Sequence, residues 1–128
     1  MKQILLVEDN AGDVLLIRQV IANAIQSVKV VAAMDGDQAI QTLSNPEFKP
    51  DLIILDLNIP KVPGLDVLER CKPTAPVVVF TSSSNPAEME RAKELGVKEF
   101  TRKPIDFDEF SNVVMRMVQD WVEPGVSV

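Results

Sequence analysis

The sequence of 128 residues contains no histidine at all. This absence excludes histidine-based acid–base catalysis, the Ser-His-Asp triad, histidine metal sites and a phosphohistidine on this chain. Only one cysteine, Cys71, is present, so an internal disulfide is excluded as well. We expect Cys71 to act as a small buried hydrophobe in a helix, not as a catalytic thiol. The chemistry of the protein therefore falls to carboxylates, hydroxyls and lysines.

The sequence also lacks a long apolar run and a basic cluster. No run approaches the roughly 20 apolar residues of a membrane-spanning helix, and the first residues lack the layout of a signal peptide. We therefore expect no membrane partner and a cytoplasmic location. The net charge of −6 argues against nucleic-acid binding, which depends on Lys and Arg neutralising phosphates. The length predicts one domain over residues 1–128, with a core of about residues 3–122 and a short C-terminal tail.

Three short apolar runs, at residues 4–7, 52–55 and 77–80, are rich in branched side chains and do not alternate with polar residues. This pattern is typical of strands buried on both faces of a parallel sheet. Two weaker strands are expected at residues 28–32 and 98–101. Together the five runs predict a central sheet that is covered on both sides.

Helical segments separate these strands. Apolar spacing predicts a helix over residues 14–25, and shorter helices are expected at 35–43, with Asp35 as N-cap, and at 64–71. Asn85-Pro86 opens a fourth helix that stops at Gly96. A fifth begins near Asp106 and ends at Pro124-Gly125, and its inward stripe is expected to contain Phe107, Phe110, Val114, Met117, Val118 and Trp121. The alternation predicts an α/β fold with a doubly wound, five-stranded parallel sheet in three layers, as in flavodoxin-like folds.

Polar side chains follow the strands where each one ends. Glu8 and Asp9 follow the first run, Asp56 the third, Thr81 ends the fourth and Lys103 follows the fifth. Ligands of open parallel sheets bind outside the carboxyl ends of the strands, so these five residues are expected to meet at one edge. Each one alone is better explained as a turn former or helix cap. The whole set favours a functional site.

Three carboxylates at one edge imply a cation. Two ionised carboxylates about 4 Å apart repel by roughly 4 kcal/mol at an effective dielectric constant of about 20. Mg²⁺ relieves this repulsion and prefers carboxylates together with phosphoryl oxygens and water. An aspartate can attack phosphorus, and Asp56 suits that role because a central strand ends on it. Glu8 and Asp9 suit the metal, while Lys103 and Thr81 would contact the phosphoryl oxygens.

The motifs at these positions resemble those of the response regulator receiver family of two-component signalling. They are Val7-Glu8-Asp9-Asn10, residues 55–60 around Asp56, Gly64, Phe80-Thr81-Ser82 and Arg102-Lys103-Pro104. Each motif is weak alone, but their order along essentially the whole chain is specific.

The resemblance implies a role for each site residue. Asp56 would be the phosphoacceptor, and Mg²⁺ would be held by Glu8, Asp9, Asp56 and the backbone carbonyl of Asn58. Lys103 would contact the phosphoryl group, and the Lys103-Pro104 peptide bond would be cis, an isomer that only proline makes at low cost.

The resemblance also implies a switch and a set of partners. Thr81 would move toward the phosphoryl group and Phe100 would rotate inward, which would reshape the face made by the fourth helix, fifth strand and fifth helix. Alternatively, Phe100 is an edge-strand residue that half covers the core. A sensor histidine kinase or a phosphotransfer protein would supply the phosphoryl group. The transfer would be self-catalysed, slow hydrolysis would reset the domain, and a downstream protein would read its state, so the chain would not be an enzyme in the ordinary sense.

A finer likeness is to stand-alone receivers that work with bacterial phytochrome-type kinases. It rests on Asp9-Asn10-Ala11-Gly12-Asp13, the serine run 82–84, and Asp120-Trp121 in the last helix. Trp121 has two interpretations: it completes the core, or it forms a homodimer contact at the end of that helix.

Three other functions fit parts of the pattern. A haloacid-dehalogenase-type phosphatase also uses an aspartate nucleophile with Mg²⁺, but its nucleophile follows the first strand and a second acid stands two residues later, where this chain has Asn58. A flavodoxin-like cofactor binder needs a phosphate-binding loop after the first strand, where Glu8 and Asp9 would repel the phosphate. An interaction module that is never phosphorylated would not need Asp56, Thr81 and Lys103 together.

Overall fold

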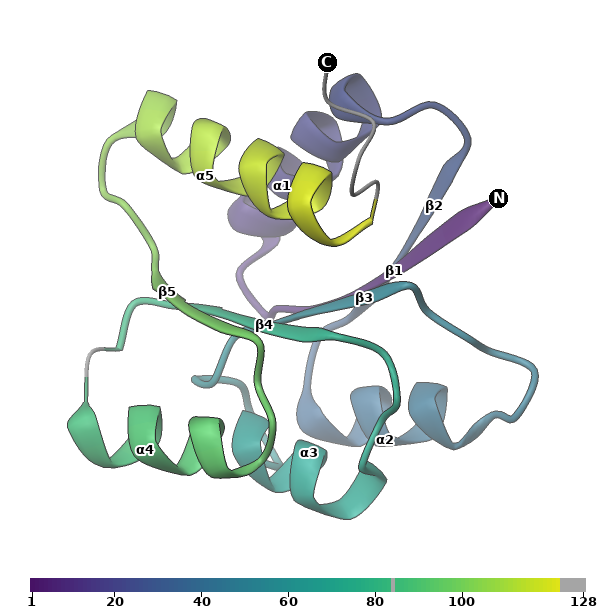
Figure 1. The fold of residues 1–128 in the computed structure, drawn as a ribbon, viewed down its shortest axis with the longest axis vertical. Coiled ribbons are helices and arrows are strands. Elements are labelled where there is room, and N and C mark those ends of the chain that lie inside the picture. The colour runs from purple at the N-terminus through teal and green to yellow at the C-terminus, as the bar shows by residue number, and fades with distance from the viewer. Residues whose placement is uncertain (84, 123–128) are drawn as a thin grey trace.

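A computed structural model describes residues 1–83 and 85–122 (Figure 1). Its strands are β1 (Lys2–Val7), β2 (Val28–Ala33), β3 (Leu52–Leu55), β4 (Val77–Thr81) and β5 (Glu99–Arg102). They form one parallel sheet in the order β2-β1-β3-β4-β5. The predicted α/β class and five-stranded parallel sheet are confirmed. β5 lies one residue further along the chain than the expected 98–101.

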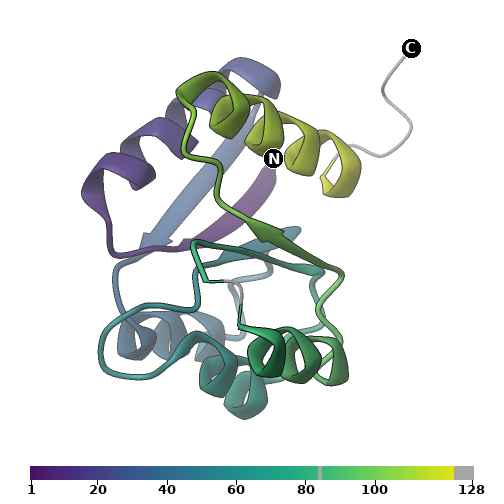
Figure 2. The same cartoon turned by 90° about the vertical axis from the view of Figure 1, so that its left-hand side faces the viewer.

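The helices are α1 (Ala11–Ala24), α2 (Gly36–Ser44), α3 (Gly64–Cys71), α4 (Pro86–Glu94) and α5 (Phe107–Trp121). α1 and α5 cover one face of the sheet, and α2, α3 and α4 cover the other (Figures 1 and 2). The chain winds outward in one direction from β1 to β2 and in the other from β3 to β5. The direction reverses between β1 and β3, so the carboxyl ends of these two strands border the crevice in which such sheets bind ligands.

Two apolar layers hold the sheet between the helices. Side chains of the central strands alternate between them: Leu6 and Ile54 face the layer under α1 and α5, whereas Leu5, Ile53 and Leu55 face the layer under α2, α3 and α4. Because both faces are covered, every residue of β3 is buried. This explains why the central strands appear in the sequence as continuous apolar runs.

Polar caps set the starts of four helices. Side-chain oxygens of Asp35, Asn85 and Asp106 accept hydrogen bonds from backbone N–H groups in α2, α4 and α5, which confirms these three predicted positions. Asn10 caps α1 in the same way, so that helix begins three residues before the expected position 14. Gly96, after α4, has a φ of +86°, a backbone conformation that favours glycine.

Three expectations about individual side chains have different outcomes. Phe107 was expected to point inward but is 65% exposed, because it is the first residue of α5 and the inward stripe begins with Phe110. Trp121 packs partly against the layer under α1 and α5 and donates from Nε1 to Glu99. Cys71 is half-buried against the opposite layer, and this burial raises the pKa of its thiol.

Two further expectations concern the ends of the fold and the membrane. The expected helix end at Pro124-Gly125 lies outside the described residues. Over residues 1–83 and 85–122, no helix is both long and apolar enough to span a bilayer.

Candidate functional site

The carboxylate of Asp56 lies at the end of β3, at the strand-order reversal. Its backbone N–H donates to the carbonyl of Val7 at 2.9 Å, which continues the β1–β3 ladder by one residue and holds Asp56 beside the end of β1. The residue is only 5% exposed. Gly64 lies against it: a Cβ on that glycine would lie 2.9 Å from the Asp56 carbonyl oxygen. The position of Asp56 is therefore set by packed backbone on both sides.

Two donors hold one oxygen of this carboxylate. The hydroxyl of Thr81, a fully buried residue at the end of β4, donates to Oδ1 of Asp56 at 2.8 Å. The backbone N–H of Asn58 donates to the same oxygen at 3.1 Å. Oδ1 is thereby fixed in direction, while Oδ2 points toward Lys103.

The ammonium of Lys103 joins three carboxylates. Its Nζ lies 2.5 Å from Oε1 of Glu8, 2.9 Å from Oδ2 of Asp13 and 2.9 Å from Oδ2 of Asp56. The backbone N–H of Lys103 donates to the carbonyl of Thr81 at 2.7 Å, so the end of β4 positions the base of this side chain. One cation at the end of β5 thus contacts the carboxyl ends of two other strands, β1 and β3, and the first turn of α1.

Burial and hydrogen bonds shift the pKa values of the ionisable groups in this cluster. Burial is the main factor that raises the pKa of Glu8 to about 7. Burial acts in the same direction on Asp56, but hydrogen bonds from Lys103, Asn58 and Thr81 bring the pKa of Asp56 below its ordinary value. Burial opposes the charge of Lys103, yet its three carboxylate partners raise the pKa of the ammonium. At neutral pH Asp56 is ionised, as a nucleophilic carboxylate must be.

Three carboxylates form a group suited to a divalent cation. One oxygen from each of Glu8, Asp9 and Asp56 lies within 4.8 Å of the others. Glu8 and Asp56 are buried, while Asp9 is exposed and leaves the group accessible from solvent. Hard divalent cations prefer oxygen ligands, and Mg²⁺ usually keeps several water molecules as well. The predicted role of the Asn58 carbonyl as a further ligand stays a prediction.

The structure brings together Glu8, Asp9, Asp56, Thr81 and Lys103, as expected from the strand ends, although their chemical roles stay predictions. One detail was wrong. The Lys103-Pro104 peptide bond is trans, not cis. Trans is the intrinsically favoured isomer even before proline, by about 0.5–1 kcal/mol, and with it Lys103 still reaches all three carboxylates.

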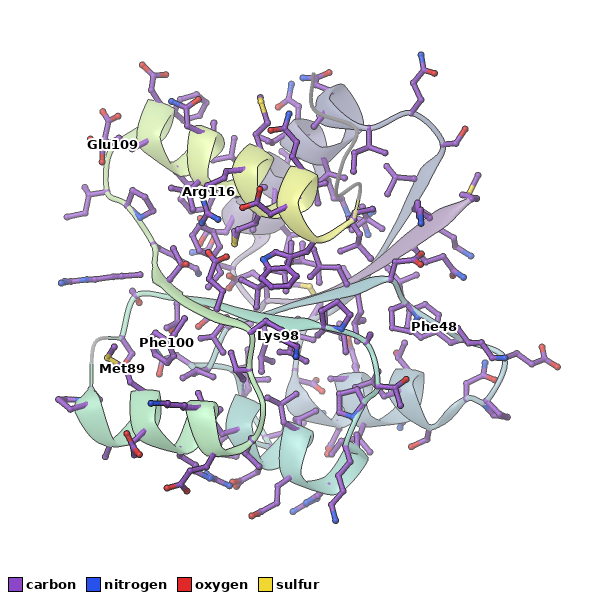
Figure 3. All side chains as sticks on the ribbon, in the orientation of Figure 1. Phe48, Met89, Lys98, Phe100, Glu109 and Arg116 are labelled. Carbon is purple, nitrogen blue, oxygen red and sulfur yellow. The ribbon has the colours of Figure 1, made fainter. Side chains whose placement is uncertain are left out.

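Phe100 lies on the side of the sheet that α4 covers. It is half-buried against the apolar layer of α2, α3 and α4, and Figure 3 shows it on the same side as Met89 of α4. Both residues line a groove of about 420 Å³ between α4 and β5. This position fits both interpretations of Phe100, as a switch residue and as a partial cover of the core.

Asp13 belongs to the cluster but was not among the predicted site residues. It lies in the first turn of α1, and its carboxylate points toward Lys103 from a position 90 residues away in sequence. The sequence offered one signal: Asp13 stands four residues after Asp9, one helical turn beyond the capping Asn10. On its own, an acid in a first helical turn is explained by the helix dipole.

Comparison with known proteins decides the family. The profile of the response regulator receiver domain matches residues 4–115, most of the chain. The chain belongs to the response regulator receiver family. It is therefore a signalling domain of two-component systems, a family in which acceptance of a phosphoryl group is typical.

Several receivers are similar over nearly their whole length. Response regulator Rcp1 of Synechocystis is 32% identical, with 95% of this chain and 90% of that protein aligned. The phosphorylated cyanobacterial phytochrome response regulator RcpA has a crystal structure with a TM-score of 0.90 and 32% identity, covering 98% of this chain and 96% of that one. The Mn²⁺-bound form of Rcp1 gives a TM-score of 0.89 at 30% identity, covering 100% and 99%. A divalent cation is thus present in the structure of one similar receiver.

Proposed function

We propose that this receiver accepts a phosphoryl group on Asp56 from a phosphohistidine of a partner histidine kinase or phosphotransfer protein. One observation carries the proposal: a buried, ionised Asp56 carboxylate has Lys103 and Thr81 at hydrogen-bond distance and two further carboxylates beside it. The donor has to be another molecule, because the chain contains no histidine.

In the proposed step, Oδ2 of Asp56 attacks phosphorus. The O–P bond forms as the P–N bond to the donor imidazole breaks, and the leaving imidazole takes up a proton. Oδ2 is the freer oxygen because Oδ1 is bound by both Thr81 and Asn58. The Lys103 ammonium, 2.9 Å from Oδ2, is close enough to move onto an oxygen of the incoming phosphoryl group.

Glu8, Asp9 and Asp56 would hold Mg²⁺, with the backbone carbonyl of Asn58 as a further ligand. The cation would neutralise charge on the phosphoryl oxygens during transfer. The donor set fits this ion: every ligand is a hard oxygen, and the exposed Asp9 leaves space for water and phosphoryl oxygens. Without a cation, one ammonium balances several carboxylates at this edge.

The signal would pass from Thr81 to the face formed by α4, β5 and α5. Thr81 ends β4, beside β5, and would shift its hydroxyl from Oδ1 of Asp56 to the phosphoryl group. Phe100 of β5 would then move within the groove that it lines with Met89. Attack of water on phosphorus would release inorganic phosphate, restore the Asp56 carboxylate and reset the domain.

The similarity to the phytochrome response regulator RcpA supports a phytochrome-type histidine kinase as the donor. The transfer would take place in the cytoplasm. Trp121 would have two roles compatible with its position. It completes the layer under α1 and α5, and its partly exposed ring at the end of α5 would contribute to a homodimer contact.

Intact-mass measurement after incubation with acetyl phosphate tests the proposal. The wild-type chain should gain the mass of one phosphoryl group with Mg²⁺ present and none when the metal is chelated. Asp56→Asn should gain none under either condition, and circular dichroism should show that it is folded. Equal phosphorylation of Asp56→Asn and wild type would overturn the proposal.

A further inference from the structure

Asp13 differs from the other carboxylates around Lys103 in where it stands. Glu8 and Asp56 follow strands, whereas Asp13 projects from the first turn of α1, whose Asn10 cap accepts the Asp13 backbone N–H at 3.0 Å. The Asp13 side chain is 27% exposed, compared with 2% for Glu8 and 6% for Asp56. It therefore reaches Lys103 from the solvent side of the cluster, from a capped helical turn.

The three carboxylates that the Lys103 ammonium contacts are not equivalent. A lysine ammonium has three N–H donors, and here they face Glu8, Asp13 and Asp56. The carboxylates grouped closely enough to share one cation are Glu8, Asp9 and Asp56. Asp13 is thus the partner of Lys103 that stands outside this group of potential metal ligands.

We propose that Asp13 is a positioning residue for phosphoryl transfer: it holds the Lys103 ammonium in place when Asp56 is phosphorylated. The inference rests on the proposed function, in which Oδ2 of Asp56 becomes bonded to phosphorus and gives up its contact with Lys103. Glu8 must at the same time share its oxygens with the cation. Asp13 keeps its contact, so one donor stays anchored while another turns to the phosphoryl group.

The physical need for such an anchor follows from the lysine side chain. Its four-carbon stem is flexible, and its ammonium is a compact charge without a fixed donor geometry. A donor aimed before the reaction contributes more than one that must be ordered during it. Because the Asn10 cap and the backbone hydrogen bond from Val14 to Asn10 fix the first turn of α1, Asp13 offers a rigid point of attachment.

A variant pair separates this role from the general benefit of an acid near a helix start. Asp13→Asn removes the charge that pairs with Lys103 and retains the backbone N–H that Asn10 caps. Asp37→Asn is the matched control, because Asp37 is an exposed acid in the first turn of α2, whereas the ion pairs of Lys103 among the described residues are with Glu8, Asp13 and Asp56. A helix-dipole effect alone would lower thermal stability slightly in both variants and change phosphorylation in neither.

The measurements are the initial rate of phosphorylation by acetyl phosphate at saturating Mg²⁺ and the Mg²⁺ dissociation constant by calorimetry. Asp13→Asn should slow phosphorylation by about 3- to 30-fold, the size of effect expected for groups in one hydrogen-bond network. Its Mg²⁺ dissociation constant should change by less than about threefold, since only long-range charge is lost. Asp37→Asn should match the wild type in both.

A double-mutant cycle completes the test. In a Lys103→Met background, Asp13→Asn should have no further effect on the rate, because the role of Asp13 acts through Lys103. If Lys103→Met does not fold, Asp13→Glu decides instead, since it keeps the charge and should recover part of the lost rate. A wild-type rate in Asp13→Asn, or a loss of Mg²⁺ affinity as large as the loss of rate, would overturn the inference. Failure of the wild type itself to accept a phosphoryl group would count against the proposed function.

Discussion

The Thr81 hydroxyl donates to Oδ1 of Asp56 at 2.8 Å across the β3–β4 pair, between two side chains buried from solvent. This contact links the carboxylate of the proposed phosphoacceptor to the strand that precedes α4. It also helps to keep Asp56 ionised, because a donor to a carboxylate stabilises the charged form.

Replacing this hydroxyl by a methyl group should cost stability without leaving a cavity. Thr81→Val keeps the shape of the side chain and removes the donor, so the free energy of unfolding should fall by about 1–2 kcal/mol. Thr81→Ser retains the hydroxyl and serves as the control for the contact with Asp56. Urea unfolding at pH 7 measures both variants, and an unchanged stability of Thr81→Val would show that the hydrogen bond contributes nothing.

Gly64 should be required for the geometry of the site as well as for the fold. In Gly64→Ala, the new Cβ would press on the Asp56 carbonyl oxygen, 2.9 Å away, and on Leu57. We expect a loss of about 1–3 kcal/mol in stability from this overpacking, together with slower phosphorylation of the protein that remains folded.

Gly96→Ala is the matched control for this effect. Gly96 has a φ of +86°, and among the described residues no atom beyond Gly96 and its two chain neighbours lies within 4 Å of the place that a Cβ would take, so alanine there should cause backbone strain alone. Its phosphorylation rate, measured by intact mass, should equal that of the wild type. If Gly64→Ala also phosphorylates at the wild-type rate, the contact with Asp56 does not govern the chemistry.

Glu99 should make stability depend on pH in the acid range. Its carboxylate accepts hydrogen bonds from Arg116, Thr101 and Trp121, and those from Arg116 are the main reason that its pKa falls from 4.5 to about 2. Since the folded pKa is depressed, the stabilisation is complete above about pH 4.5 and disappears as the pH falls through about 2.

Glu99→Gln should therefore be less stable than the wild type by about 1–3 kcal/mol at pH 7, and the difference should shrink toward pH 2. Asp120→Asn removes only the exposed partner of Arg116 and should cost about 0.5 kcal/mol or less. Unfolding curves between pH 2 and pH 7 test both. A pH-independent gap between Glu99→Gln and the wild type would contradict the assignment.

Glu8 should couple Mg²⁺ affinity to pH. Burial raises its pKa to about 7, so a large fraction of the metal-free protein carries a proton on Glu8 below that pH. In the absence of metal, ionisation of Glu8 should cost stability as the pH rises from about 4.5 through about 7. Because a bound cation needs the carboxylate, Mg²⁺ binding below pH 7 should release a proton.

Calorimetric titrations at pH 6, 7 and 8 measure this coupling. The Mg²⁺ dissociation constant should decrease as the pH rises, by up to about tenfold per unit below pH 7, and level off above it. In Glu8→Gln the affinity should be lower and nearly independent of pH over this range. Equal wild-type affinity at pH 6 and pH 8 would exclude Glu8 as the titrating ligand.

Local sequence patterns were enough to predict much of the fold. The central strands could be predicted because burial on both faces leaves only apolar residues, as at 52–55. Asp35 and Asn85 could be predicted as caps because their short polar side chains satisfy free N–H groups at a helix start. The start of α5 could be predicted near Asp106, which proves to be its cap. The direction of Phe107 could not, since at the first position of a helix the periodic pattern does not yet determine which way a side chain points.

For the site, the sequence could predict only those residues whose positions are set by the ends of the strands. The sheet itself places Glu8, Asp56 and Thr81 at adjoining strand ends, so the strand pattern was enough to expect them together. The contact of Asp13 with Lys103 depends on a long side chain and on the exact start of α1, neither of which periodicity specifies. The cis and trans isomers of a peptide bond before proline differ by little free energy. Neither the sequence nor the resemblance therefore determines which isomer the Lys103-Pro104 bond adopts.

Locating the phosphoryl group on the chain tests the central claim most directly. The wild-type protein is phosphorylated with acetyl phosphate and Mg²⁺, treated with borohydride, which reduces an acyl phosphate to an alcohol, and digested for peptide mass mapping. Homoserine at position 56, and at no other aspartate, is the expected result. Reduction at Asp9, Asp13 or any other acidic residue, with Asp56 intact, would contradict the account.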